Sequence, residues 1–167
     1  MIISLIGFMA AGKTTLGKEL AQRVGAPFID LDNYIEEKEG KTIPEIFATE
    51  GENKFREMEA SSLEDILEEY ISQSPETLED NTRCSLVISL GGGAVMNPQC
   101  RDLISRFTFC VYIKRDIETL LSRLSTPQEK ESRALLKDED SNSLRETVER
   151  LYKEREPLYE ALANTTI

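Results

Sequence analysis

The sequence contains no histidine and no tryptophan, and its three cysteines form no CxxC pair. Without histidine the chain has no Ser-His or Cys-His nucleophile pair and no histidine-based metal site. Proton transfer must therefore use a carboxylate, lysine, tyrosine or water. The odd number of cysteines (Cys84, Cys100 and Cys110) argues against a disulfide framework or zinc site and fits a reducing cytoplasm.

Long hydrophobic runs are also missing, since none approaches the roughly 18 residues of a membrane-spanning helix. The N-terminus is apolar but has no basic region ahead of it, so we expect a buried first strand rather than a signal peptide. The length of 167 residues suits one domain with one core, so we expect residues 1–167 to form a single unit. We expect this unit to be monomeric and not to bind membranes.

Positive charge is scarce, because 20 Lys and Arg face 31 Asp and Glu, which gives a net charge of 20 − 31 = −11. A field of that sign repels nucleic acid, so we expect no nucleic-acid partner. Any anionic ligand must find a locally positive pocket. The few well-placed cations are therefore the most informative residues.

Short apolar runs bounded by glycine or polar residues predict four buried strands. These runs cover residues 2–6, 27–32, 86–90 and 109–113. Helical spacing of apolar residues is found at 13–24, 33–38, 43–49, 52–70, 98–106, 116–124 and 143–162. Strands that alternate with helices predict an α/β fold of three layers, with a mainly parallel sheet between helices. The polar stretches 72–85 and 125–142 are expected to be loops.

The segment GFMAAGKT, from Gly7 to Thr14, matches the phosphate-binding pattern G-x-x-x-x-G-K-[ST]. Its glycines allow backbone N–H groups to face a phosphate, and the following helix adds the positive end of its dipole. Lys13 is expected to reach the β- and γ-phosphates of ATP, and Thr14 to bind Mg²⁺. A glycine turn without a ligand is the alternative, but the position between an apolar strand and an amphipathic helix favours a P-loop. The expected ATP contacts are Gly7, Ala10, Ala11, Gly12, Lys13, Thr14 and Thr15.

Two carboxylates, Asp30 and Asp32, follow the second apolar run. Alternation along a strand would place both on one side, at the strand end where ligands collect in an open α/β sheet. Beside a P-loop, one could support Mg²⁺ and the other a hydroxyl acceptor. The alternative is that Asp32 only caps the helix that follows.

Arg56 and Glu59 are three residues apart on a predicted helix and could pair there. A solvated surface salt bridge is one interpretation. The other is an arginine held by Glu59 and directed at an anionic substrate, because the guanidinium group donates two parallel hydrogen bonds to a carboxylate.

Three consecutive glycines, Gly91, Gly92 and Gly93, follow the third apolar run. Such a run is typical of a backbone that approaches a ligand closely, although a plain turn is the alternative. Arg133 and Arg155 would, in isolation, be ordinary surface arginines.

Together these segments resemble the shikimate kinase family of P-loop kinases. The resemblance covers residues 1 to about 162 and depends on the segments GFMAAGKTTLG, FIDLD, GENKFREMEA, SLGGGAV, SRALL and REPLY, in this order. It implies a cytoplasmic enzyme that uses MgATP to convert shikimate to shikimate 3-phosphate in the synthesis of chorismate and aromatic amino acids. It also implies a substrate-binding helical segment at about 32–62 and a mobile lid at about 125–142.

The resemblance assigns roles to particular residues of this sequence. Lys13, Asp32 and Arg133 would be catalytic, with Arg133 as the lid arginine that also contacts ATP. Thr14 would bind Mg²⁺ directly and Asp30 through water. The expected shikimate contacts are Asp32, Arg56, Gly91, Gly92, Gly93 and Arg155.

The sequence also departs from the family pattern. Ala10 stands where glycine is common, the lid reads SRALL instead of RPLL, and 72–85 looks like an insertion. The sequence given stops at Ile167, where the family continues with an adenine-contacting segment. We therefore expect 163–167 to be only the start of a last strand. The alternatives are a gluconate or nucleoside-monophosphate kinase, and a nucleotide-binding switch without transfer activity.

Overall fold

The computed structural model describes residues 1–73, 83–131, 136 and 140–167. In these residues a five-stranded sheet has the order β2-β3-β1-β4-β5, and every pairing is parallel. The strands are β1 (Ile2–Ile6), β2 (Phe28–Asp30), β3 (Leu86–Ser89), β4 (Thr108–Tyr112) and β5 (Thr165–Thr166). The predicted parallel sheet is confirmed.

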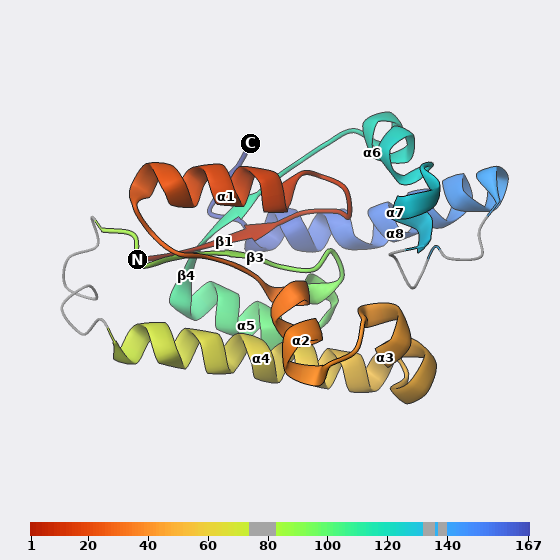
Figure 1. Cartoon of the computed structure of the whole chain (residues 1–167). Helices are drawn as coiled ribbons and strands as arrows, with labels where there is room; N and C mark the ends of the chain where they lie inside the picture. Colours follow the sequence, from red (N-terminus) through yellow and green to blue (C-terminus); the bar gives the residue numbers. More distant parts are fainter. Residues whose placement is uncertain (74–82, 132–135, 137–139) are drawn as a thin grey trace.

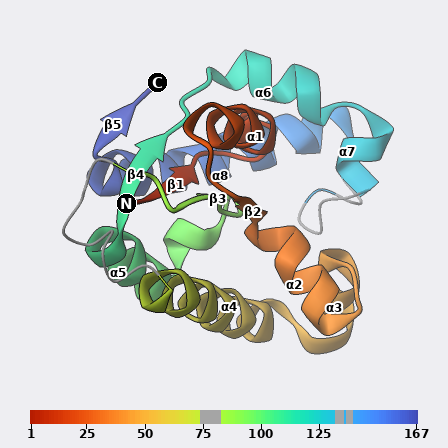
Figure 2. The ribbon, with the colours of Figure 1, turned by 60° about the vertical axis from the view of Figure 1, so that its left-hand side comes forward.

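Helices lie on both faces of the sheet, as predicted (Figures 1 and 2). Their bounds are α1 (Lys13–Val24), α2 (Leu31–Glu39), α3 (Ile43–Glu50), α4 (Glu52–Ser72), α5 (Pro98–Phe107), α6 (Ile117–Leu124), α7 (Pro127–Glu131) and α8 (Ser141–Leu162). Helix α1 covers one face, whereas α4 and α5 lie on the other (Figure 1). A short 3-10 turn, η2 (Ala94–Met96), follows the triple glycine.

The central strands form the core of the molecule. All residues of β1 and β3 are buried, and β1 pairs with β3 on one side and β4 on the other. The sequences of such strands are continuously apolar because helices cover both faces of a parallel sheet. Their carboxyl ends therefore meet along one edge, where the P-loop, the end of β2 and the triple glycine come together.

Several predicted boundaries were wrong. The strand expected at 27–32 ends at Asp30, because the Asp30 side chain caps α2 and the chain turns helical at Leu31. The stretch 125–142 is not entirely loop, since α7 occupies part of it. Residues 74–82, within the predicted insertion, lie outside the described residues.

The segment after α8 already pairs with the sheet. Thr165 and Thr166 lie beside Val111 and Tyr112 of β4, and this two-residue strand is exposed. Among the described helices, none is both long and apolar enough to span a lipid bilayer.

Candidate active site

The predicted P-loop connects β1 to α1. Gly12 has a φ of 98°, a conformation that side chains disfavour, and α1 begins at the next residue. The side chain of Lys13 is buried, and its Nζ donates hydrogen bonds to the carbonyl oxygens of Gly7 (2.8 Å) and Phe8 (2.9 Å). The lysine therefore lies inside the curve of the loop, close to where a bound phosphate would be.

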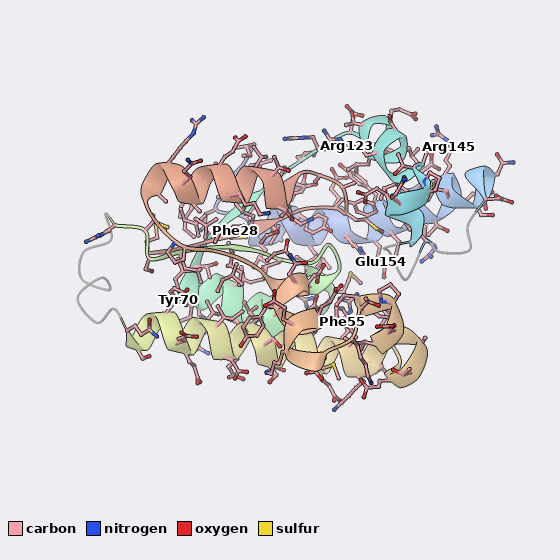
Figure 3. All side chains as sticks on the ribbon, viewed as in Figure 1. Phe28, Phe55, Tyr70, Arg123, Arg145 and Glu154 are labelled. Atoms are coloured by element: carbon pink, nitrogen blue, oxygen red, sulfur yellow. The ribbon has the colours of Figure 1, made fainter. Side chains whose placement is uncertain are left out.

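Ala10 has a φ of 62° and is, among the described residues, the non-glycine residue with positive φ. This explains why glycine would suit the position, because a side chain in this region costs on the order of 1 kcal/mol. Arg123 on α6 (Figure 3) donates from Nη1 to the carbonyl oxygen of Ala10 at 2.7 Å. Sequence reasoning missed Arg123, because one arginine in a helix gives no signal of contact with a loop 113 residues earlier.

Asp30 connects the P-loop helix to α2. Its Oδ2 accepts a hydrogen bond from the Thr14 hydroxyl at 2.7 Å, and its Oδ1 accepts from the backbone N–H groups of Asp32 (3.1 Å) and Asn33 (3.4 Å). The helix cap is therefore Asp30, so the alternative in which Asp32 caps the helix was wrong. The expectation that both carboxylates share one side of a strand was also wrong, because Asp32 lies in the first turn of α2.

The triple glycine makes room for the acidic and basic side chains around it. A β-carbon on Gly91 would lie 2.8 Å from Asp32 Oδ1 and 3.2 Å from Glu59 Oε1. A β-carbon on Gly93 would lie 2.3 Å from Arg56 Nη2. Contacts this short are not tolerated, so side chains here would displace the groups that line the pocket.

The pair formed by Arg56 and Glu59 is not a solvated surface bridge. Arg56 Nη1 lies 2.9 Å from Glu59 Oε2, and the two side chains are only 17% and 1% exposed. Burial lowers the pKa of Arg56, but the carboxylates of Glu59 and Glu52 outweigh it and raise this pKa above its usual value. Burial raises the pKa of Glu59 to about 7, although the neighbouring guanidinium opposes the shift.

We expect Glu59 to make stability depend on pH in an unusual direction. Its pKa is about 7 in the folded chain, against an ordinary 4.5, so folding binds a proton between these values. Stability should therefore decrease by about 3 kcal/mol as pH rises from 4.5 to 7, because the folded state retains a proton that the unfolded chain releases.

This expectation can be tested by urea unfolding of Glu59→Gln and the wild type across that range. The variant should gain stability relative to the wild type as pH rises. Glu57→Gln, which changes an exposed carboxylate on the same helix, is the matched control and should follow the wild type. Parallel profiles for Glu59→Gln and the wild type would contradict the assignment.

Arg155 on α8 is buried, with only 4% of its surface exposed. Its guanidinium lies over the ring of Phe8, 5.8 Å from the ring centre, and its Nε has no hydrogen-bond partner in the described residues. Within the described parts of the chain, it forms no salt bridge with a carboxylate. Burial lowers its pKa. A buried guanidinium without a carboxylate partner favours an anion beside it.

The predicted site residues surround two adjoining cavities. The first, of about 300 Å³, is lined by Asp32, Arg56, Glu59, Gly91, Gly92, Gly93 and Arg155, among others. The second, of about 340 Å³, is lined by Ala10, Gly12, Lys13, Thr14, Thr15 and Arg123, among others. The residues common to both are Thr14, Asp30, Asp32, Gly91 and Gly92. Gly7 and Ala11 are buried and do not line either cavity.

Sequence reasoning did not single out the apolar wall of the first cavity. Met9, Ile43, Phe47 and Phe55 line it. Phe47 on α3 packs against Phe55 on α4, with ring centres 5.0 Å apart. The cavity therefore combines apolar surface with two arginines, which suits a small anionic molecule with a hydrocarbon body.

Arg133, the expected lid arginine, lies outside the described residues. Of the surrounding SRALL segment only Leu136 is described, and it is fully buried. The described site therefore comprises the two cavities without this arginine.

A parallel sheet with a P-loop after its first strand, and a second pocket at the same edge, defines a P-loop kinase. In the comparisons, the shikimate kinase family model matches residues 9–167. The shikimate kinase of Chloroherpeton thalassium is 42% identical over 165 residues, covering 96% of this chain and 79% of the relative. That of Dictyoglomus turgidum is 36% identical over 165 residues, covering 99% and 86%. The chain therefore belongs to the shikimate kinase family.

Solved structures agree with this assignment. Shikimate kinase from Acinetobacter baumannii in complex with shikimate has a TM-score of 0.83 and 35% identity, covering 99% of this chain and 82% of that one. Deoxyadenosine kinase from M. mycoides with bound dATP has a TM-score of 0.55 at 14% identity. The second likeness concerns the fold alone.

Proposed function

We propose that this chain transfers the γ-phosphoryl group of ATP to the 3-hydroxyl of shikimate. The observation that most supports this is the pair of adjoining cavities. One surrounds a P-loop lysine, and the other contains a buried arginine that has no carboxylate partner among the described residues. In a chain of net charge −11, such an arginine is a costly feature unless an anion binds there.

On the ATP side, the P-loop backbone and the N-terminus of α1 bind the phosphates. Lys13 exchanges its bonds to the Gly7 and Phe8 carbonyls for the β- and γ-phosphates. Gly12, Thr14 and Thr15 line the same cavity. Arg123 supports the loop through its hydrogen bond to the Ala10 carbonyl, and it also lines the cavity in which ATP would bind.

The residues present fit Mg²⁺. The Thr14 hydroxyl and the Asp30 carboxylate lie side by side at the P-loop, and both are oxygen donors of the kind that Mg²⁺ prefers. Thr14 would hold the ion directly and Asp30 through a water molecule. When bound, Mg²⁺ neutralises charge on the β- and γ-phosphates.

On the shikimate side, the substrate carboxylate binds between Arg56 and Arg155, both of which line the first cavity. Glu59 pairs with Arg56 and fixes the direction of its guanidinium group. The carbocyclic ring packs against the apolar wall of Met9, Ile43, Phe47 and Phe55. The glycines at 91–93 allow the ring to approach the backbone.

Transfer takes place where the cavities meet, at Asp32. As the shikimate oxygen bonds to the γ-phosphorus, the bond from that phosphorus to the bridging oxygen of ADP breaks, and Asp32 accepts the hydroxyl proton. Lys13 and the lid arginine, Arg133, stabilise charge on the transferring group.

The test is ADP release measured with a coupled assay, using shikimate, gluconate and AMP as separate acceptors. We expect strong stimulation by shikimate alone. Equal turnover with gluconate or AMP, and none with shikimate, would favour the rival kinases. Nucleotide binding without acceptor-dependent release would favour a switch.

A further inference from the structure

Tyr159 on α8 lines neither cavity, although it contacts Gly92, which lines both. Its side chain is fully buried, and its ring stacks on Tyr112 of β4 with ring centres 5.1 Å apart. Its hydroxyl donates a hydrogen bond to the carbonyl oxygen of Gly92. The tyrosine therefore joins α8 to the triple glycine at the floor of the first cavity.

Gly92 and Arg155 are the two neighbours through which Tyr159 can influence the site. A β-carbon on Gly92 would lie 3.0 Å from the Met9 backbone nitrogen and 3.6 Å from Arg155 Nη1. Gly92 therefore lies between the P-loop backbone and the buried guanidinium of Arg155. Arg155 lies one helical turn before Tyr159 on α8. Burial raises the pKa of Tyr159, and the neighbouring charge of Arg155 opposes this shift.

The hydroxyl can act on Arg155 through Gly92. Its proton goes to the Gly92 carbonyl, which fixes this glycine beside the Arg155 guanidinium. In the described part of the chain the Arg155 Nε has no hydrogen-bond partner, so few polar contacts fix the direction of this guanidinium. A phenylalanine would keep the ring stack and lose the hydrogen bond to Gly92.

We propose that Tyr159 is a positioning residue for substrate recognition, whose hydroxyl fixes the Gly91–Gly93 loop against Arg155 so that the guanidinium meets the substrate carboxylate. This inference goes further than the proposed function and depends on it. Tyr159 does not line the cavity and is not expected to touch the substrate. Its loss should therefore affect shikimate binding and leave the nucleotide site unchanged.

The first test is Tyr159→Phe, with KM for shikimate and for ATP measured separately. We expect KM for shikimate to rise about tenfold, as for a lost buried hydrogen bond, while KM for ATP changes less than about twofold. Tyr112→Phe is the matched control. It removes the other hydroxyl of the same ring stack, which is buried without a hydrogen-bond partner in the described structure, and KM should not change.

A purely structural role needs its own control. Val148→Ala removes buried apolar volume from α8 away from both cavities. It should lower the melting temperature and leave KM for shikimate unchanged. If Val148→Ala raises KM as much as Tyr159→Phe does, Tyr159 acts only through stability and the inference is overturned.

The second test is a double-mutant cycle with Arg155→Lys, read out as the calorimetric Kd for shikimate. If Tyr159 acts through Arg155, adding Tyr159→Phe to Arg155→Lys should weaken binding less than about twofold. Multiplicative effects would overturn the inference. No shikimate binding by the wild type would overturn the proposed function and this inference together. Wild-type binding that is unchanged in Tyr159→Phe would overturn the role of Tyr159 alone.

Discussion

Replacing Asp32 by asparagine is expected to lower kcat by about two to four orders of magnitude, the usual contribution of a general base. Asp32 lies where the two cavities meet, beside Gly91 and the P-loop. Asparagine has the same shape and can still orient a hydroxyl, but it cannot accept the proton. The loss should therefore appear in kcat at saturating substrates rather than in ADP affinity.

The fold should tolerate this change, because the cap of α2 uses the Asp30 side chain and only the backbone of Asp32. Asp65→Asn is the matched control. It makes the same chemical change at an exposed position on α4, where Asp65 pairs with Lys38, and kcat should stay at the wild-type value. A kcat for Asp32→Asn within about threefold of wild type would exclude Asp32 as the base.

The second large effect is expected from Arg155→Gln, which should raise KM for shikimate by about two to three orders of magnitude. Removing a buried charge that pairs with a ligand charge costs about 2–5 kcal/mol. Arg155 is buried, and the protein itself supplies no carboxylate partner for it in the described residues. The substrate carboxylate would be that partner.

Arg150→Gln tests whether this effect is specific, because Arg150 is exposed on the same helix. It should leave both KM values unchanged. If Arg155→Gln raised KM for ATP and left that for shikimate alone, Arg155 would belong to the nucleotide site. The carboxylate assignment would then be wrong.

The P-loop could be predicted from sequence because its chemistry is local. Eight consecutive residues determine the turn, the lysine and the helix that follows. The buried strands and most of the helices followed from periodicity for the same reason, whereas the order of the strands in the sheet was not predicted. The end of β2 could not be predicted, because Asp30 accepts hydrogen bonds both from α2 and from Thr14, 16 residues earlier in the chain.

Burial of charged residues was the main feature that sequence did not reveal. The spacing of Arg56 and Glu59 fits a surface bridge as well as a buried one, and only packing decides between them. Arg155 and Tyr159 are buried because α8 packs against η2 and β4, segments about 50 residues earlier. Short-range patterns contain no information about such contacts.

Identification of the product would show directly whether the chain phosphorylates shikimate. The chain is incubated with MgATP and shikimate, and the product is examined by mass spectrometry and phosphorus NMR. We predict that shikimate gains one phosphoryl group, that its phosphorus signal is coupled to the proton at carbon 3, and that one ADP forms for each product molecule. Release of ADP and inorganic phosphate at the same rate with and without shikimate would contradict this prediction.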